Sequence, residues 1–156
     1  MNPNDNYWMK LALSLANSAK AIDEVPIGAI IVKENTLISA GFNTRETLKK
    51  LTGHAEIEAI SRANKNLDSW RLNDCELYVT LEPCIMCAAA LQQARIKRVI
   101  YGANDPKGGG LGSLYNINSD TRLNHNFEVT TGVLQEDCSN ILKDYFRQKR
   151  KKKKKV

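Results

Sequence analysis

The sequence contains only two histidines and four cysteines, and three of these six residues stand in two short motifs. His54 lies two residues before Glu56, and Cys84 and Cys87 are three apart behind a proline. Imidazole and thiolate groups are ligands that Zn²⁺ prefers, and a catalytic zinc site keeps three protein ligands and one open position. His54, Cys84 and Cys87 would supply the three ligands. Glu56 would then stand beside the metal-bound water as general base and acid.

Both motifs are expected where a helix begins after a strand. Pro83 suits the entry to a helix, because its missing N–H would have no partner there. Cysteines three apart at a helix start lie roughly 60° apart around the axis, so both sulfurs can face one ion. The helix dipole favours thiolate at that end. Thr52-Gly53 is likewise expected to start the helix that carries Glu56.

The remaining elements follow from the spacing of apolar residues. A three-four spacing from Tyr7 to Ile22 predicts an amphipathic helix, with Asn4-Asp5-Asn6 as possible caps. β-rich runs predict five strands, and a last helix closes the chain. The strands are expected at Val25–Val32, Thr36–Asn43, Glu76–Glu82, Lys97–Ala103 and Phe127–Val133, with the last helix at 136–150.

The alternation of strands and helices predicts an α/β sandwich. The third strand, its helix and the fourth strand should form a right-handed crossover with parallel strands. Ligands collect beyond the carboxyl ends of strands in such sheets, and both motifs are placed there. The long connection Asn104–Asn126 is expected to be either functional or disordered.

Charge is distributed unevenly along the 156 residues, which have a net charge of +6. Eight Lys or Arg lie in Arg147–Lys155, which leaves 15 basic against 17 acidic residues elsewhere. We therefore predict one domain over residues 1–150 and a polybasic, disordered C-terminal tail over residues 151–156. This tail is either a solubility tail or a phosphate-binding arm. Cysteine usage and the lack of a long apolar run predict a cytoplasmic protein with reduced thiols and no membrane contact.

A closed structural zinc site is the alternative to a catalytic one. Cys75, Cys138 and His125 are the candidates for a fourth ligand. Cys75 is expected at the far end of its strand, and Cys138 is expected to pack as a small apolar residue on the last helix. His125 stands in a polar loop, where a surface or RNA-contacting role is expected.

The chain resembles the bacterial tRNA-specific adenosine deaminases of the cytidine-deaminase superfamily over roughly residues 6–150. The motifs that carry the resemblance are EVPIGAI, FNTRE, HAE, SWRL, LYVTLEPCIMCA, KRVIYGANDPKGG, GSL and YFRQKR. The resemblance implies a three-layer α/β/α fold around a five-stranded mixed sheet, in a single cytidine-deaminase-like zinc deaminase domain. It also implies a homodimer with one Zn²⁺ per subunit. The implied reaction is hydrolytic conversion of the wobble adenosine of a tRNA anticodon stem-loop to inosine.

The resemblance also implies roles for individual residues. His54, Cys84 and Cys87 match the zinc ligands, and Glu56 matches the group that carries a proton from water to the adenine ring. Backbone N–H groups near Ala55 and Cys84 would stabilise the tetrahedral intermediate. The residues that match substrate and RNA contacts are Asn43, Asp105, Lys107, Phe146 and Arg147. Ala89, Asn104 and Gly53 depart from the usual family pattern, and of these Asn104 bears on the anticodon-loop contacts.

Two other functions fit part of the pattern. The first is a free-base or nucleotide deaminase of the guanine or deoxycytidylate type, with the same zinc chemistry. A small-molecule enzyme has no use for a basic arm, and the motifs of the body match the tRNA family better. The second is a zinc-stabilised RNA-binding module without turnover. Glu56 argues against that module, because a structural zinc site does not need an acid beside it.

Overall fold

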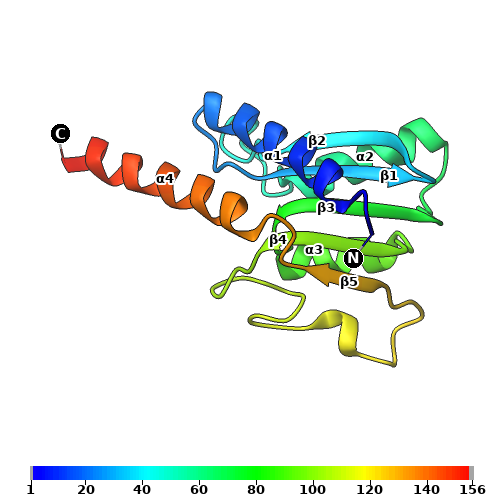
Figure 1. Ribbon diagram of the computed structural model, residues 1–156. Helices are drawn as coiled ribbons and strands as arrows, with labels where there is room; N and C mark the ends of the chain where they lie inside the picture. Colours follow the sequence, from blue (N-terminus) through cyan, green and yellow to red (C-terminus); the bar gives the residue numbers. More distant parts are fainter. Residues whose placement is uncertain (1, 155–156) are drawn as a thin grey trace.

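The computed structural model describes residues 2–154, which form a five-stranded sheet with helices on both faces (Figure 1). The strands lie in the order β2-β1-β3-β4-β5. β1 is antiparallel to β2 and to β3, whereas β3, β4 and β5 are parallel to one another. The sheet is therefore mixed, and the parallel pairing expected on either side of the third helix is confirmed. The strands are β1 (Gly28–Lys33), β2 (Thr36–Phe42), β3 (Cys75–Leu81), β4 (Arg98–Ala103) and β5 (Glu128–Thr131).

Apolar side chains on both faces of the sheet create the three layers. In β3, Leu77 and Val79 face one core and Tyr78 faces the other, as the alternation of a strand requires. Helices α2 (Ala55–Leu67) and α3 (Ile85–Gln93) cover the first face. Helices α1 (Asp5–Ala21) and α4 (Gln135–Lys154) cover the second. The predicted α/β/α sandwich with a five-stranded mixed sheet is thus confirmed.

The first strand begins three residues later than the sequence predicts. Pro26 lacks the N–H that a ladder needs, and the N–H of Ile27 donates to the carbonyl of Val25, so the chain turns before β1. The hairpin between β1 and β2 is as expected. Its two turn residues, Glu34 and Asn35, have φ of 49° and 60°, the conformation that matches the twist of paired strands.

The start of α1 differs from the expected capping arrangement. Asn4 is the cap residue but its side chain makes no capping bond. Asp5 is fully buried instead, with carboxylate oxygens 2.8 and 3.1 Å from the guanidinium nitrogens of Arg98 and 2.6 Å from the Tyr78 hydroxyl. The N-terminal helix is therefore tied to the centre of the sheet by a buried ion pair.

Helix α4 extends beyond the predicted end of the domain. Residues 151–154 continue the helix, where the sequence predicted a disordered tail over 151–156; residues 155–156 lie outside the described part. Lysine is a good helix former, and positive charge near a helix C-terminus interacts favourably with the helix dipole, which explains the extension. In Figure 1, α4 projects away from the body of the protein. Over residues 2–154, every helix is too short or too polar to cross a bilayer.

Candidate active site

Two helix N-termini meet at the edge of the sheet where β2 and β3 end. His54 is the N-cap residue of α2 and Cys84 is the N-cap residue of α3. Neither side chain makes a capping hydrogen bond, so both are free to bind something else. The helix α2 begins at Ala55 and not at Thr52-Gly53, because the carbonyl of Gly53 accepts the N–H of Thr44 and closes the preceding loop.

The donor atoms of His54, Cys84 and Cys87 lie within 4.8 Å of one another. Nδ1 of His54 is 3.7 Å from Sγ of Cys84 and 3.5 Å from Sγ of Cys87. Zn–N and Zn–S bonds of ordinary length at a tetrahedral angle would separate nitrogen from sulfur by about 3.6 Å. The three groups therefore have the spacing that a tetrahedral metal ion requires.

The electrostatics of the two thiols also suit a cation. Hydrogen bonding to Cys87 lowers the pKa of Cys84 to about 4, and His54 adds to the effect. The hydrogen bond to Cys84, together with burial, raises the pKa of Cys87 well above its ordinary range. One thiolate thus forms readily, and the second is opposed by the charge of the first. A divalent cation between the donors would allow both sulfurs to ionise.

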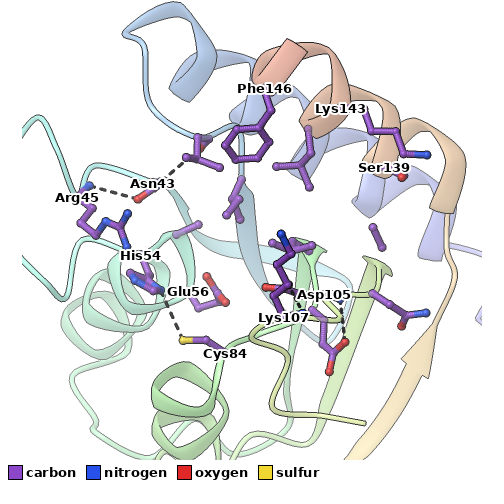
Figure 2. A pocket seen from close by; sticks show the side chains of 18 of the residues that line it. Asn43, Arg45, His54, Glu56, Cys84, Asp105, Lys107, Ser139, Lys143 and Phe146 are labelled. Atoms are coloured by element: carbon purple, nitrogen blue, oxygen red, sulfur yellow. Dashed lines mark hydrogen bonds between the residues drawn. The ribbon is translucent and has the colours of Figure 1, made fainter. Parts of the chain in front are cut away.

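Glu56 lies beside this group in the first turn of α2. Its side chain is 4% exposed and faces the cavity together with His54 and Cys84 (Figure 2). Burial raises the pKa of Glu56 to about 7, and the negative charge of Cys84 contributes to the shift. A carboxyl group with a pKa near neutrality can both take up and release a proton, which is what a general base and acid needs.

The alternative fourth ligands lie elsewhere. Cys75 is buried at the amino end of β3, and Cys138 is buried in the core between α4 and the sheet. The ring of His125 hydrogen-bonds the carbonyl of Ile96 at 2.6 Å, in a loop before β5. Within residues 2–154, the only group of three or more His, Cys, Asp or Glu with metal-ligand spacing is His54, Cys84 and Cys87. A fourth coordination position would be left for water or substrate.

A cavity of about 880 Å³ opens above this group. Nine of the ten site residues predicted from the sequence line it, and the tenth, Cys87, is fully buried. Figure 2 shows side chains of α4 on one side of the cavity and His54, Glu56 and Cys84 on the other. The nine lining residues are Asn43, His54, Ala55, Glu56, Cys84, Asp105, Lys107, Phe146 and Arg147. Two of them, Ala55 and Cys84, are at helix N-termini, where backbone N–H groups lack helical partners.

Two of the predicted contact residues are held by backbone hydrogen bonds. The Asn43 amide donates to the carbonyl of Val25 at 3.4 Å and accepts the N–H of Arg45 at 3.2 Å. One carboxylate oxygen of Asp105 accepts the N–H groups of Lys107 and Gly108, each at 3.2 Å. The Asp105 carboxylate therefore shapes its own turn, in addition to facing the cavity.

Several residues of the cavity wall receive no role in the sequence analysis, although Arg45 stands in the FNTRE motif and Arg150 in the YFRQKR motif. Lys143 and Arg150 line it from α4, and Arg45 lines it from the loop before His54. Lys143 lies four residues before Arg147, and Arg150 lies four residues after Phe146. The spacing of one helical turn could therefore have identified both. Arg45 follows Asn43 by two residues, and nothing in its own spacing indicates that it faces the site.

Comparisons with known proteins agree with this geometry. Residues 3–150 match the family model of MafB19-like deaminases. The tRNA-specific adenosine deaminase of Streptococcus pyogenes serotype M1 is 47% identical over 148 residues, which cover 95% of this chain and 86% of the relative.

Two solved structures are similar as well. One comes from work on A-to-I editing by tRNA:A34 deaminases at the wobble position and is 44% identical, with a TM-score of 0.84. The alignment covers 87% of this chain and 99% of that one. A guanine deaminase from Nitrosomonas europaea is 27% identical, with a TM-score of 0.78 and coverage of 92% and 84%. The chain belongs to the MafB19-like deaminases and, within them, to the tRNA-specific adenosine deaminases.

Proposed function

We propose that this enzyme hydrolyses the 6-amino group of the wobble adenosine in a tRNA anticodon loop and releases inosine and ammonia. The proposed cofactor is one Zn²⁺ per subunit, held by His54, Cys84 and Cys87. It would act as a Lewis acid that makes water a better nucleophile at neutral pH. We further expect a homodimer that acts in the cytoplasm, as in the family that the sequence resembles.

The positive charge of the cavity wall is the observation that best supports a polynucleotide substrate. Five cations line the cavity, against three acidic residues, and one of these acids is the proposed catalytic Glu56. Three of the cations come from one face of α4, which leads away from the metal ligands. A free purine would occupy only the floor of the cavity, whereas a polyanion extends along this wall. The five cations are Arg45, Lys107, Lys143, Arg147 and Arg150.

The residues of this chain would divide the chemistry as follows. Glu56 takes a proton from water and delivers it to ring nitrogen 1 of adenine. It then takes the proton of the hydroxyl formed on carbon 6 and passes it to the amino group, which leaves as ammonia. The backbone N–H groups at Ala55 and Cys84 stabilise the negative charge that develops on oxygen as carbon 6 becomes tetrahedral. Because Glu56 is buried, these proton transfers occur away from bulk water.

Substrate placement would fall to the rim of the cavity. The base has to leave the stack of the loop to reach carbon 6, and a single-stranded loop allows this at small energetic cost. The ring of Phe146 is 44% exposed at the cavity wall and offers a surface for stacking a base. The amide of Asn43, which is fixed by bonds to the backbone, would hold the flipped nucleoside.

Guanine deamination is the second candidate, favoured by the structural similarity to the Nitrosomonas europaea enzyme. The same metal and the same glutamate would serve that reaction. The two candidates differ in substrate size, because only a polynucleotide reaches the cations of α4. Ammonia release from guanine, cytidine and free adenosine should therefore stay at background while tRNA is converted.

The test of the proposed function is Glu56→Gln, measured by inosine formation in tRNA and by metal analysis. The amide keeps the shape of the side chain and cannot carry the proton, so turnover should fall by roughly 10²–10⁴-fold. The metal content should stay at that of the unmutated enzyme. Turnover near that of the unmutated enzyme would overturn the assignment of Glu56.

A further inference from the structure

Glu82 is a buried carboxylate that the proposed chemistry does not use. Glu82 precedes Pro83 in the sequence, directly after β3 ends, and is 2% exposed. The carboxylate accepts the backbone N–H of Asp105 at 3.0 Å, of Leu111 at 3.0 Å and of Ser113 at 3.1 Å. It also accepts the hydroxyl of Ser113. All four donors belong to one loop, residues 104–113, which we call the Glu82-bound loop.

The Glu82-bound loop packs directly on the turn that carries the metal ligand Cys84. The N–H of Gly110 donates to the carbonyl of Pro83 at 2.8 Å, and Gly109 forms a β-bridge with Cys84. A Cβ atom on Gly109 would lie 2.3 Å from the carboxyl carbon of Glu82. The loop therefore fits against Glu82 only because a glycine stands there.

The same loop forms one wall of the cavity. Asp105, whose N–H is bound by Glu82, lines the cavity together with Lys107 two residues later. Figure 2 shows both side chains beside the cavity, opposite the residues of α4. A carboxylate that binds four donors from one segment fixes the backbone of that segment more firmly than a single bond would.

We propose that Glu82 is a positioning residue, which fixes the Glu82-bound loop so that Asp105 and Lys107 contact the nucleotides next to the target adenosine. This inference rests on the proposed deamination of an anticodon loop at the same cavity. Glu82 touches neither the reacting atoms nor the three metal ligands in this role. Its effect reaches the substrate only through the loop.

The first variant is Glu82→Gln, which keeps the size of the side chain. An amide offers one acceptor oxygen, and its NH₂ group then faces two of the four donors. Only the Ser113 hydroxyl can turn and accept, so at least one of the three bonds to backbone N–H groups is broken. Displacement of the loop should lower kcat/KM for an anticodon stem-loop RNA by about 10- to 100-fold. We expect most of the loss in KM, because Glu56 and the metal ligands keep their places. Metal content should equal that of the unmutated enzyme.

The readout that isolates positioning is discrimination between two RNA substrates. One is the natural stem-loop, and the other has abasic sites on both sides of the target adenosine. The unmutated enzyme should prefer the natural RNA, because the loop contacts the flanking bases. Glu82→Gln should lose most of this preference. A general loss of stability would lower activity on both RNAs by the same factor.

Two further variants keep the test informative if Glu82→Gln folds poorly. Ser113→Ala removes one of the four bonds from an exposed residue and should reduce the preference in the same direction, by a smaller factor. Lys107→Ala combined with Ser113→Ala should cost less than the product of the two single effects, since both act through the same loop. The matched control is Asp120→Asn, which removes a carboxylate bound to Arg122 at the surface of the same long connection.

The outcomes separate the two proposals. If the unmutated enzyme fails to convert the natural RNA, the proposed function is wrong. If it converts that RNA, and Glu82→Gln and Ser113→Ala keep the full preference for natural flanking bases, the role of Glu82 is wrong. Equal losses on both RNAs, or a similar loss in Asp120→Asn, would also overturn it.

Discussion

Helix α4 carries two pairs of cations with the same i,i+3 spacing and the same charge, Arg147 with Arg150 and Lys149 with Lys152. The two pairs lie on different sides of the helix. Arg147 and Arg150 line the cavity. Lys149 lies on another side, 2.8 Å from Asp23, and the charge of Lys152 also acts on Asp23. If α4 holds RNA by its cavity-facing side, removing the two arginines should weaken binding far more than removing the two lysines.

The magnitude follows from the phosphate charges that the two arginines would neutralise. Each phosphate that is no longer neutralised should reduce the slope of log affinity against log salt by about 0.7 on single strands and 0.9 on duplex RNA, by analogy with DNA. The double variant R147A/R150A should therefore lower the slope by about 1.4 to 1.8. Between 50 and 200 mM salt, this change amounts to a factor of about 7 to 12 in relative affinity. The ion pair of Arg147 with Asp144 is exposed, so its removal should alter stability by less than about 1 kcal/mol.

The assay is a salt titration of tRNA affinity for the unmutated protein, R147A/R150A and K149A/K152A. The lysine variant is the control, because it removes two charges at the same spacing on the same helix. Its slope should change by much less than that of the arginine variant. Equal changes in the two variants would show that α4 attracts RNA by total charge alone and would refute the argument from its cavity-facing side.

Two further predictions concern the metal group and the buried ion pair. Cys87→Ala should lose both bound metal and deamination, because it removes one of three donors with tetrahedral spacing, and a full complement of metal in this variant would show that another residue completes the site. Asp5→Asn should lower the free energy of unfolding at pH 7 by about 1.5–3 kcal/mol, since Arg98 loses one of its two carboxylate partners and keeps Glu76. Burial alone would raise the pKa of Asp5, but hydrogen bonds from Arg98 and Tyr78 lower it below 3.8. The stabilisation is therefore present above about pH 4 and is lost at lower pH. In urea unfolding, the free energies of unfolding of the unmutated protein and of Asp5→Asn should converge in acid, and a constant difference at all pH values would contradict this.

The residues of the metal group can be predicted from the sequence more easily than the buried hydrogen bonds and ion pairs that hold the surrounding elements in place. The motifs around His54 and Cys84 can be interpreted because metal ligands and helix starts are local in sequence, and the spacing within each motif limits the geometry. Asp5 is expected from the sequence to cap a helix, because its partner Arg98 is 93 residues away and no local pattern connects them. Glu82 stands inside a recognisable motif without a predicted role for the same reason, since its four donors come from a loop of no regular structure.

The sequence predicts a last helix that ends at Arg150 and a disordered tail after it, whereas the structure has one helix over Gln135–Lys154. Residues up to Arg150 have the apolar spacing of a packed helix, whereas the lysines that follow have only charge, and charge alone indicates disorder. The helix continues because intrinsic propensity and the helix dipole favour it where no packing is available. The cavity-facing positions of Lys143 and Arg150 depend on the rotation of the whole helix against the sheet, which the sequence does not specify.

The wall formed by α4 comes later in the chain than the metal ligands and Glu56. The metal ligands and Glu56 are all encoded before residue 90, and residues 139–150 complete the cavity much later. A chain that ends before α4 would carry the metal ligands and Glu56 but lack three of the five cations of the cavity wall. The two parts are also separable by design: exchanging the last helix for that of a relative would change which polymer or small molecule is accepted, while the atoms that cleave the C–N bond stay the same.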